Sequence, residues 1–346
     1  MSAQNPVRAG IVGLGRWGQN LVEANRKNPD SRLAIVRAAT RSPDKAREFC
    51  ASQALPLDPN LETLLASDDI EAVILATPHS QHAAQIRSAA AAGRHVFVEK
   101  PLALTLADAS TAIEACEAAG ARLAVGFNRR FLPAFKEMQE AFAEGRLGRP
   151  LHIEGNFSGP FGYQYTDEMW RGSTTENPAG GMAAMGIHIL DAMIAVMGPV
   201  ARVSVLSRRL AVSSHLDDTT TVLLGFVSGA TGTLSTIMAT ASYWRLHAFG
   251  ASGWAQMPDQ HRLILADLSG KSEEQRFDPV DTLAAELHAF ALMIREDRTY
   301  PVSGEQALAS VAAMEAITRS ALDGGSWVSV EAAKPRLTNT SNTETR

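Results

Sequence analysis

The first 125 residues alternate short apolar runs with helical patterns, and this alternation limits the fold more than any other feature of the chain. Strands that alternate with helices form βαβ units, because parallel neighbours need a crossover connection. The pattern predicts a Rossmann-type, doubly wound parallel sheet with helices on both faces, an α/β class of fold. The strand-like runs lie at residues 7–12, 33–39, 71–76, 95–98 and 122–125.

The pattern changes after about residue 126, where strand-like runs follow one another with few helices between them. Consecutive strands of this kind pair antiparallel, so we expect a C-terminal α+β domain with an open, mainly antiparallel sheet. The predicted division is a dinucleotide-binding Rossmann domain at 1–125, an α+β substrate and oligomerisation domain at 126–330 and a disordered tail at 331–346. The later strand-like runs lie at 151–157, 200–210, 219–226, 231–239 and 245–249, and late helices at 281–296 and 304–322.

Composition excludes several classes of function. The chain has 32 Lys and Arg against 37 Asp and Glu, a formal charge of −5, which argues against nucleic acid or an anionic membrane as the main partner. Cys50 and Cys116 form no CxxC pair, and no His, Asp or Glu set has metal-ligand spacing, so we expect neither a disulfide framework nor a metal site. No signal-peptide pattern and no long apolar window is present, and we expect a cytoplasmic protein that acts on a small molecule.

A glycine motif joins the first strand to the first helix: Gly13-Leu14-Gly15-Arg16-Trp17-Gly18. In this position Gly13 permits a tight turn, Gly15 lets the backbone approach a pyrophosphate and Gly18 allows close helix–strand packing. The free N–H groups of the helix N-terminus, at Arg16 and Trp17, suit phosphate oxygens. The motif predicts a dinucleotide site; a glycine-rich turn without a ligand is the alternative.

The end of the second strand bears on the choice of nicotinamide cofactor. An acidic residue at this place accepts a hydrogen bond from the ribose of NAD, about 20 residues after the glycines. Here the sequence has Thr40, Arg41 and Ser42, which offer donors and one positive charge. These residues suit a 2′-phosphate, so we expect NADP to be preferred, with NAD possible. Arg41 stacking on the adenine is the alternative.

Two more strand ends carry polar residues that face the same edge of the sheet. Thr77, Pro78 and His82 follow the third predicted strand, and His82 either packs structurally behind the cofactor or contacts the substrate. Glu99 and Lys100 end the next strand. A lysine in that crevice is partly desolvated, which lowers its pKa toward the range of a proton-transfer group.

Together these motifs resemble the Gfo/Idh/MocA family of oxidoreductases. The similarity rests on the glycine motif, on Glu-Lys-Pro at 99–101 and on Gly-Phe-Asn-Arg-Arg-Phe-Leu-Pro at 126–133, and it extends over about residues 6–330. The resemblance implies reversible hydride transfer between a nicotinamide and a secondary alcohol or carbonyl of a sugar, polyol or cyclic diol. It also implies a homodimer or homotetramer assembled through the C-terminal sheet.

The resemblance further implies roles for single residues. Lys100 contacts the reacting oxygen and the nicotinamide ribose, and with Glu99 it belongs to the cofactor site. His188 in Gly-Ile-His-Ile-Leu-Asp is the acid/base, and Asp191 is the acid three residues later. Many members have an aspartate where this chain has Ala184, on the helix face of positions 188 and 191. A less polar substrate, or one that carries its own carboxylate, fits this change. Further substrate-binding candidates are Arg129, Trp170 and Arg171.

Alternatives remain open from the sequence. His188 also fits a buried histidine on an apolar helix, and Asp191 either orients His188 or belongs to a local hydrogen-bond network. Arg171 either clamps a substrate carboxylate or is solvated. Ala184 keeps open a dinucleotide-binding regulatory protein without turnover. A lyase or glycosidase that uses tightly held NAD for a transient oxidation is a third class.

Overall fold

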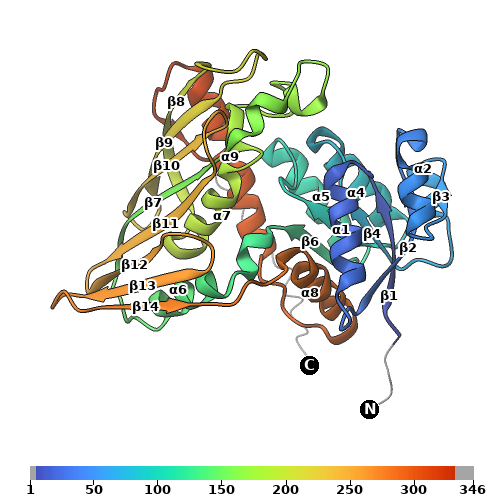
Figure 1. The fold of residues 1–346 in the computed structure, drawn as a ribbon, viewed down its shortest axis with the longest axis horizontal. Coiled ribbons are helices and arrows are strands. Elements are labelled where there is room, and N and C mark those ends of the chain that lie inside the picture. The colour runs from blue at the N-terminus through green and yellow to red at the C-terminus, as the bar shows by residue number, and fades with distance from the viewer. Residues whose placement is uncertain (1–4, 332–346) are drawn as a thin grey trace, which may run out of the picture.

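The N-terminal part of the chain forms a parallel sheet, sheet A (Figure 1). The structure, a computed structural model, describes residues 5–331. Within this range the order of sheet A is β3-β2-β1-β4-β5-β6 and every pair is parallel, which confirms the predicted doubly wound fold. The strands are β1 (Val7–Val12), β2 (Leu33–Ala39), β3 (Leu57–Asp58), β4 (Ala72–Leu75), β5 (His95–Glu99) and β6 (Leu123–Gly126).

Helices connect these strands and cover the sheet. Strand β4 is buried along its whole length, as expected of a central strand covered on both faces. The side chain of Asn60 accepts a hydrogen bond from the backbone N–H of Thr63 and so caps the N-terminus of α3. The helices are α1 (Arg16–Lys27), α2 (Pro43–Ser52), α3 (Leu61–Leu65), η1 (His79–Gln81), α4 (His82–Ala91) and α5 (Leu106–Ala118).

The later part forms a second, larger sheet, sheet B. Among the described residues its order is β14-β13-β12-β11-β7-β10-β9-β8-β15, and only β10 and β7 pair parallel, which confirms an open, mainly antiparallel sheet. Its strands are β7 (Pro150–Ser158), β8 (Val200–Arg208), β9 (Thr219–Phe226), β10 (Thr231–Ile237), β11 (Tyr243–Gly250), β12 (Gly253–Met257), β13 (Arg262–Asp267), β14 (Ser272–Arg276) and β15 (Val328–Ser329).

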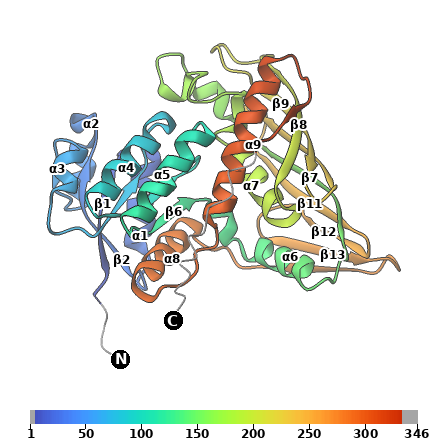
Figure 2. The ribbon, with the colours of Figure 1, turned by 180° about the vertical axis from the view of Figure 1, so that it is seen from behind.

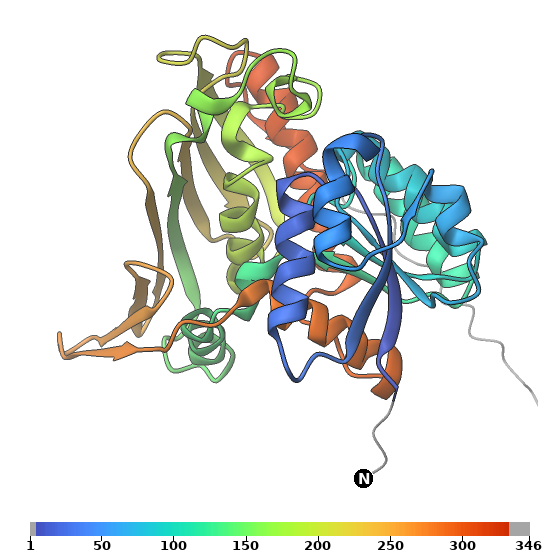
Figure 3. The same cartoon turned by 45° about the vertical axis from the view of Figure 1, so that its right-hand side comes forward.

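Helices cover one face of sheet B, the face that looks toward sheet A (Figures 2 and 3). Strands such as β9 alternate buried and exposed residues, the pattern of a sheet with one covered and one open face. Gly155 of β7 lets α7 approach closely, because a Cβ there would lie 2.2 Å from the side chain of Ile189. The remaining helices are η2 (Asn128–Phe131), α6 (Pro133–Ala143), η3 (Pro160–Gln164), η4 (Trp170–Gly172), η5 (Gly180–Met182), α7 (Gly186–Met197), α8 (Thr282–Glu296) and α9 (Gly304–Leu322).

Helix α8 lies late in the sequence but packs against α1 and the strands of sheet A. The domain boundary predicted at residue 125 stays a prediction. A domain defined by its contacts with sheet A would also include α8. The predicted tail, 331–346, lies outside the described residues except for Glu331. Of the helices in residues 5–331, none has the length and apolar character needed to cross a membrane.

Candidate active site

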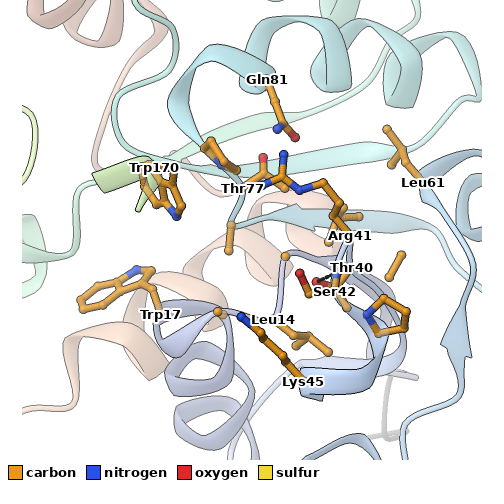
Figure 4. A pocket seen from close by; sticks show the side chains of 18 of the residues that line it. Leu14, Trp17, Thr40, Arg41, Ser42, Lys45, Leu61, Thr77, Gln81 and Trp170 are labelled. Atoms are coloured by element: carbon orange, nitrogen blue, oxygen red, sulfur yellow. Dashed lines mark hydrogen bonds between the residues drawn. The ribbon is translucent and has the colours of Figure 1, made fainter. Parts of the chain in front are cut away.

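A cavity of about 770 Å³ opens at the carboxyl edge of sheet A (Figure 4). It lies where the strand order changes direction between β1 and β4, the usual ligand site of an open α/β sheet. Its volume falls within the range of small-molecule and cofactor sites. The predicted residues that line it are Gly13, Gly15, Arg16, Trp17, Gly18, Thr40, Arg41, Ser42, Thr77, Pro78, Trp170 and Arg171.

The glycine motif forms one wall of this cavity. Gly13 has φ of +94°, and a Cβ there would lie 2.4 Å from the carbonyl oxygen of Ala76. A Cβ on Gly18 would lie 1.9 Å from the carbonyl oxygen of Gly13, whereas Gly15 has open space. Gly15 is also the N-cap of α1 and provides no side-chain cap, so the first N–H groups of α1 are free for a ligand. These features fit the pyrophosphate of a nicotinamide dinucleotide.

Thr40, Arg41 and Ser42 lie on the side of the cavity away from Trp17 and Trp170 (Figure 4). Lys45 of α2, a residue that the sequence analysis missed, also lines the cavity. The signal that could have identified it is a lysine in the first turn of the helix that follows the second strand. The group offers two positive charges where the sequence predicted one.

His82 lies behind the cavity and does not line it. Its Nδ1 is 2.7 Å from the carbonyl oxygen of Pro101 and its Nε2 is 3.0 Å from that of Thr77. It is fully buried, and burial is the main reason that its pKa is lowered. The side chain connects the loops that follow β4 and β5, so the geometry favours the structural alternative.

The segment between β7 and α7 is tied to the loop after β4 by Glu176, a residue that sequence reasoning missed. The backbone N–H of Ser80 donates to Oε2 of Glu176 at 3.1 Å, and the Ser80 hydroxyl donates to Oε1. Nδ1 of His79 lies 2.8 Å from the carbonyl oxygen of Glu176. The His79 ring also packs edge-on against Trp170 at 5.1 Å. These contacts hold Trp170 and Arg171 at the mouth of the cavity.

Lys100 follows β5 and reaches the loop that precedes α7. Its ammonium donates to the carbonyl oxygens of Ala183, at 3.2 Å, and Ala184, at 3.0 Å. Burial lowers the pKa of Lys100 to about 8, and the positive charges of Arg171 and Arg129 act in the same direction, while Glu99 opposes them. Two carbonyls therefore hold the ammonium, and its third proton is left for another acceptor.

His188 lies in the first turn of α7. The positive charge of Lys100 disfavours the protonated imidazole of His188. Its ring packs near Phe127 and Phe157, with centroids 6.5 and 6.1 Å away. Its Nδ1 is buried and has no hydrogen-bond partner among residues 5–331. Burial, Lys100 and Arg129 lower the pKa of His188 well below its ordinary value. This shift favours the neutral form of the imidazole.

Asp191 points to Arg130 of η2. Nε of Arg130 donates to Oδ2 at 2.6 Å and Nη2 donates to Oδ1 at 2.9 Å, a two-point contact between buried groups. Burial raises the pKa of Asp191, and the charge of Arg130 opposes this change. The sequence analysis missed Arg130 as its partner. The geometry favours the local-network alternative for Asp191, because the pair joins the end of β6 to α7.

Two buried carboxyl groups lie near Lys100. Glu99 is the predicted residue; Glu286 of α8 was missed, although it occupies the apolar face of that helix with Phe290. Both oxygens of Glu286 and Oε1 of Glu99 are buried without hydrogen-bond partners in the described part of the chain. Burial raises the pKa of both groups, Glu286 well above its usual range, and Lys100 opposes each shift.

The arrangement brings an ammonium from the edge of sheet A and a neutral imidazole from α7 together beside a dinucleotide-sized cavity. Such a pair can polarise an oxygen and accept its proton. A nicotinamide bound in the cavity would supply the hydride acceptor or donor. Lys100 reaches the carbonyls just before α7, and His188 lies in the first turn of that helix. The predicted residues Glu99, Lys100, His82, His188 and Asp191 are not among those that line the cavity.

Comparisons with known proteins agree with this geometry. Residues 7–127 match the model of an oxidoreductase family with an NAD-binding Rossmann fold, and residues 135–256 match the GFO/IDH/MocA C-terminal domain. The myo-inositol 2-dehydrogenase of Thermotoga maritima is 29% identical, over 86% of this chain and 91% of that protein.

Two solved structures also resemble the whole chain. A putative NADPH-dependent oxidoreductase from Desulfitobacterium hafniense is 27% identical with a TM-score of 0.85, over 94% of this chain and 98% of that one. The WlbA dehydrogenase of Bordetella pertussis, in complex with NADH and UDP-GlcNAcA, is 25% identical with a TM-score of 0.84, over 95% and 99%. The chain belongs to the GFO/IDH/MocA family and is a nicotinamide-dependent oxidoreductase.

Proposed function

We propose that the protein transfers hydride reversibly between NAD(P) and a secondary alcohol or carbonyl of a sugar, polyol or cyclic diol. The observation that carries this proposal is that Lys100, at the end of β5, donates to the two carbonyls just before α7, the helix that holds His188 in its first turn. Lys100, held by two carbonyl oxygens, polarises the reacting oxygen with its free N–H. Neutral His188 takes the hydroxyl proton during oxidation and returns it during reduction. Asp191 holds α7 in place through Arg130.

The test is a screen of alcohols and carbonyl compounds at the nicotinamide absorbance, with NADP and NAD in parallel. Stoichiometric change in the cofactor supports the proposal. Binding of cofactor without turnover on any compound favours the regulatory alternative. Product formation without net change in the cofactor favours the lyase or glycosidase alternative.

We propose NADP as the preferred cofactor. The support is the group formed by Thr40, Arg41, Ser42 and Lys45, which presents two cations and two hydroxyls and no carboxylate to the cavity. Such a group suits a 2′-phosphate through charge-assisted hydrogen bonds.

We also propose that two copies associate through the open face of sheet B. Leu206 and Leu223 are 58% and 45% exposed there, and Tyr243 is 51% exposed on β11 of the same sheet. A second copy would bury these apolar side chains. A molar mass from light scattering tests the proposal, and Leu223→Glu is expected to give monomers.

Free Cys50 and Cys116 suit a reducing compartment, and we propose the cytoplasm.

A further inference from the structure

Three cationic side chains belong to the substrate side. Lys100 donates to two carbonyl oxygens just before α7, Arg129 rests on Phe157 beside His188, and Arg171 rests on Trp170 in the segment before α7. The charges of Arg129 and Arg171 both lower the pKa of Lys100, and the charges of Lys100 and Arg129 lower that of His188. Within residues 5–331, none of the three cations forms an ion pair with a carboxylate. Unpaired cations with little access to water are costly, so a site of this kind favours an anion as its ligand.

The two arginines rest on aromatic rings. The guanidinium carbon of Arg171 lies 4.2 Å from the ring centre of Trp170, and that of Arg129 lies 5.8 Å from the ring centre of Phe157. Contacts of this kind hold a guanidinium in place without using its N–H groups. Nε of Arg129 is buried and has no hydrogen-bond partner in the part of the chain that the structure describes.

The two arginines differ in their relation to the dinucleotide cavity. Arg171 lines the cavity together with Arg16, so its charge also faces the place of the cofactor phosphates. Arg129 does not line the cavity. Its aromatic partner Phe157 lies 6.1 Å from the ring of His188. Arg129 is therefore the cation that the cofactor leaves free on the substrate side.

Two buried acids lie near these cations. Burial lowers the pKa of Lys100 and of Arg129, while Glu99 and Glu286 act to raise that of Lys100 and Glu286 acts to raise that of Arg129. No hydrogen bond joins Glu286 to Arg129 or Lys100 among the described residues. Ala184 lies just before α7 and not on its helix face as predicted; its carbonyl oxygen accepts from Lys100 and its methyl group packs against the apolar cluster of Met185, Leu216 and Met238. A substrate anion would meet no acidic side chain at that position.

We propose that the substrate is a hydroxy acid: a sugar- or polyol-type alcohol that carries a carboxylate, which binds to the guanidinium of Arg129. A carboxylate matches the paired N–H donors of a guanidinium, and the resulting hydrogen bonds are charge-assisted. The acid group then fixes the position of the hydroxyl between Lys100 and His188. This inference rests on the proposed function, because it names the substrate class for the same site.

The experiment compares matched pairs of compounds with the full-length protein: uronates against the neutral aldoses, and aldonates against the neutral alditols. We expect kcat/KM to be at least about tenfold higher for the acid of the preferred pair. Arg129→Gln is expected to reduce kcat/KM on the acid by about tenfold or more, mainly through KM, and so to narrow the ratio of kcat/KM between the acid and its neutral counterpart. Arg129→Lys keeps the charge and should recover part of the preference.

Arg149→Gln is the matched control, because Arg149 is exposed on the surface before β7. Its acid-to-neutral ratio should equal that of the wild type. A wild-type protein that uses neutral compounds as well as their acids overturns this inference and leaves the proposed function intact. Absence of turnover with every alcohol and carbonyl compound defeats the proposed function instead. The wild-type ratio decides the question even where Arg129→Gln does not fold.

Discussion

The two sides of the active site are built in different ways. On the cofactor side, the glycine motif places backbone groups around the cavity within six consecutive residues, 13–18. On the substrate side, the chemistry depends on residues that are far apart in sequence, such as Lys100 and His188, which separate elements hold together. A local backbone motif is visible in a sequence, whereas a site made of distant side chains depends on packing.

The largest stability effect is expected on the substrate side, at the buried pair of Arg130 and Asp191. Asp191→Asn leaves the Arg130 charge buried without its counter-ion, which should lower the free energy of unfolding by about 3–5 kcal/mol. Urea unfolding measures this change. Asp167→Asn is a control at an exposed ion pair with His215, where little change in the free energy of unfolding is expected. A stable Asp191→Asn protein that has lost turnover would instead assign Asp191 to the chemistry.

A smaller effect is expected on the cofactor side. Arg41→Ser removes one cation from the group that faces the proposed 2′-phosphate, and should weaken NADP binding by about 1.5–3 kcal/mol, roughly tenfold to 100-fold, with little change for NAD. Titration calorimetry with both cofactors checks this. An equal loss of affinity for NADP and NAD would show that Arg41 contacts a part of the dinucleotide that both cofactors share. Arg87→Ser, on α4 outside the cavity lining, is the control.

The pH dependence of kcat/KM tests the roles of Lys100 and His188 on the substrate side. The pKa of Lys100 is lowered to about 8, so the ammonium form is present below that pH and is lost above it. The pKa of His188 is lowered well below 6.5, so the neutral imidazole persists through the physiological range. We expect kcat/KM to be flat near pH 7 and to fall above about 8, by about tenfold per pH unit. A rate that rises through pH 8 would make Lys100 the base.

The same contrast explains what the sequence could predict. Periodicity identified both sheets, and motifs located the cavity lining from Gly13 to Pro78. The partner of Asp191 could not be predicted, because Arg130 lies 61 positions away and no local pattern joins them. Glu286 lies in a predicted helix, but its burial depends on α8 packing on sheet A.

The strands β12, β13 and β14 were missed for a related reason. Every residue of β14 is exposed, so the segment has no apolar alternation to mark it as a strand. Its pairing with β13 supplies the backbone hydrogen bonds that define it. These strands lie at the edge of sheet B, away from the site, so their omission did not affect the functional prediction.

In the proposed mechanism, Lys100 serves mainly the reaction rather than the affinity for the dinucleotide. Lys100→Met removes the ammonium but keeps a side chain of similar length. Turnover should fall by about 10²–10⁴-fold, while the affinity for the cofactor, measured by calorimetry, stays close to that of the wild type. Lys271→Met, at an exposed turn before β14, is the control. Near-normal turnover of Lys100→Met on its substrate would contradict the account.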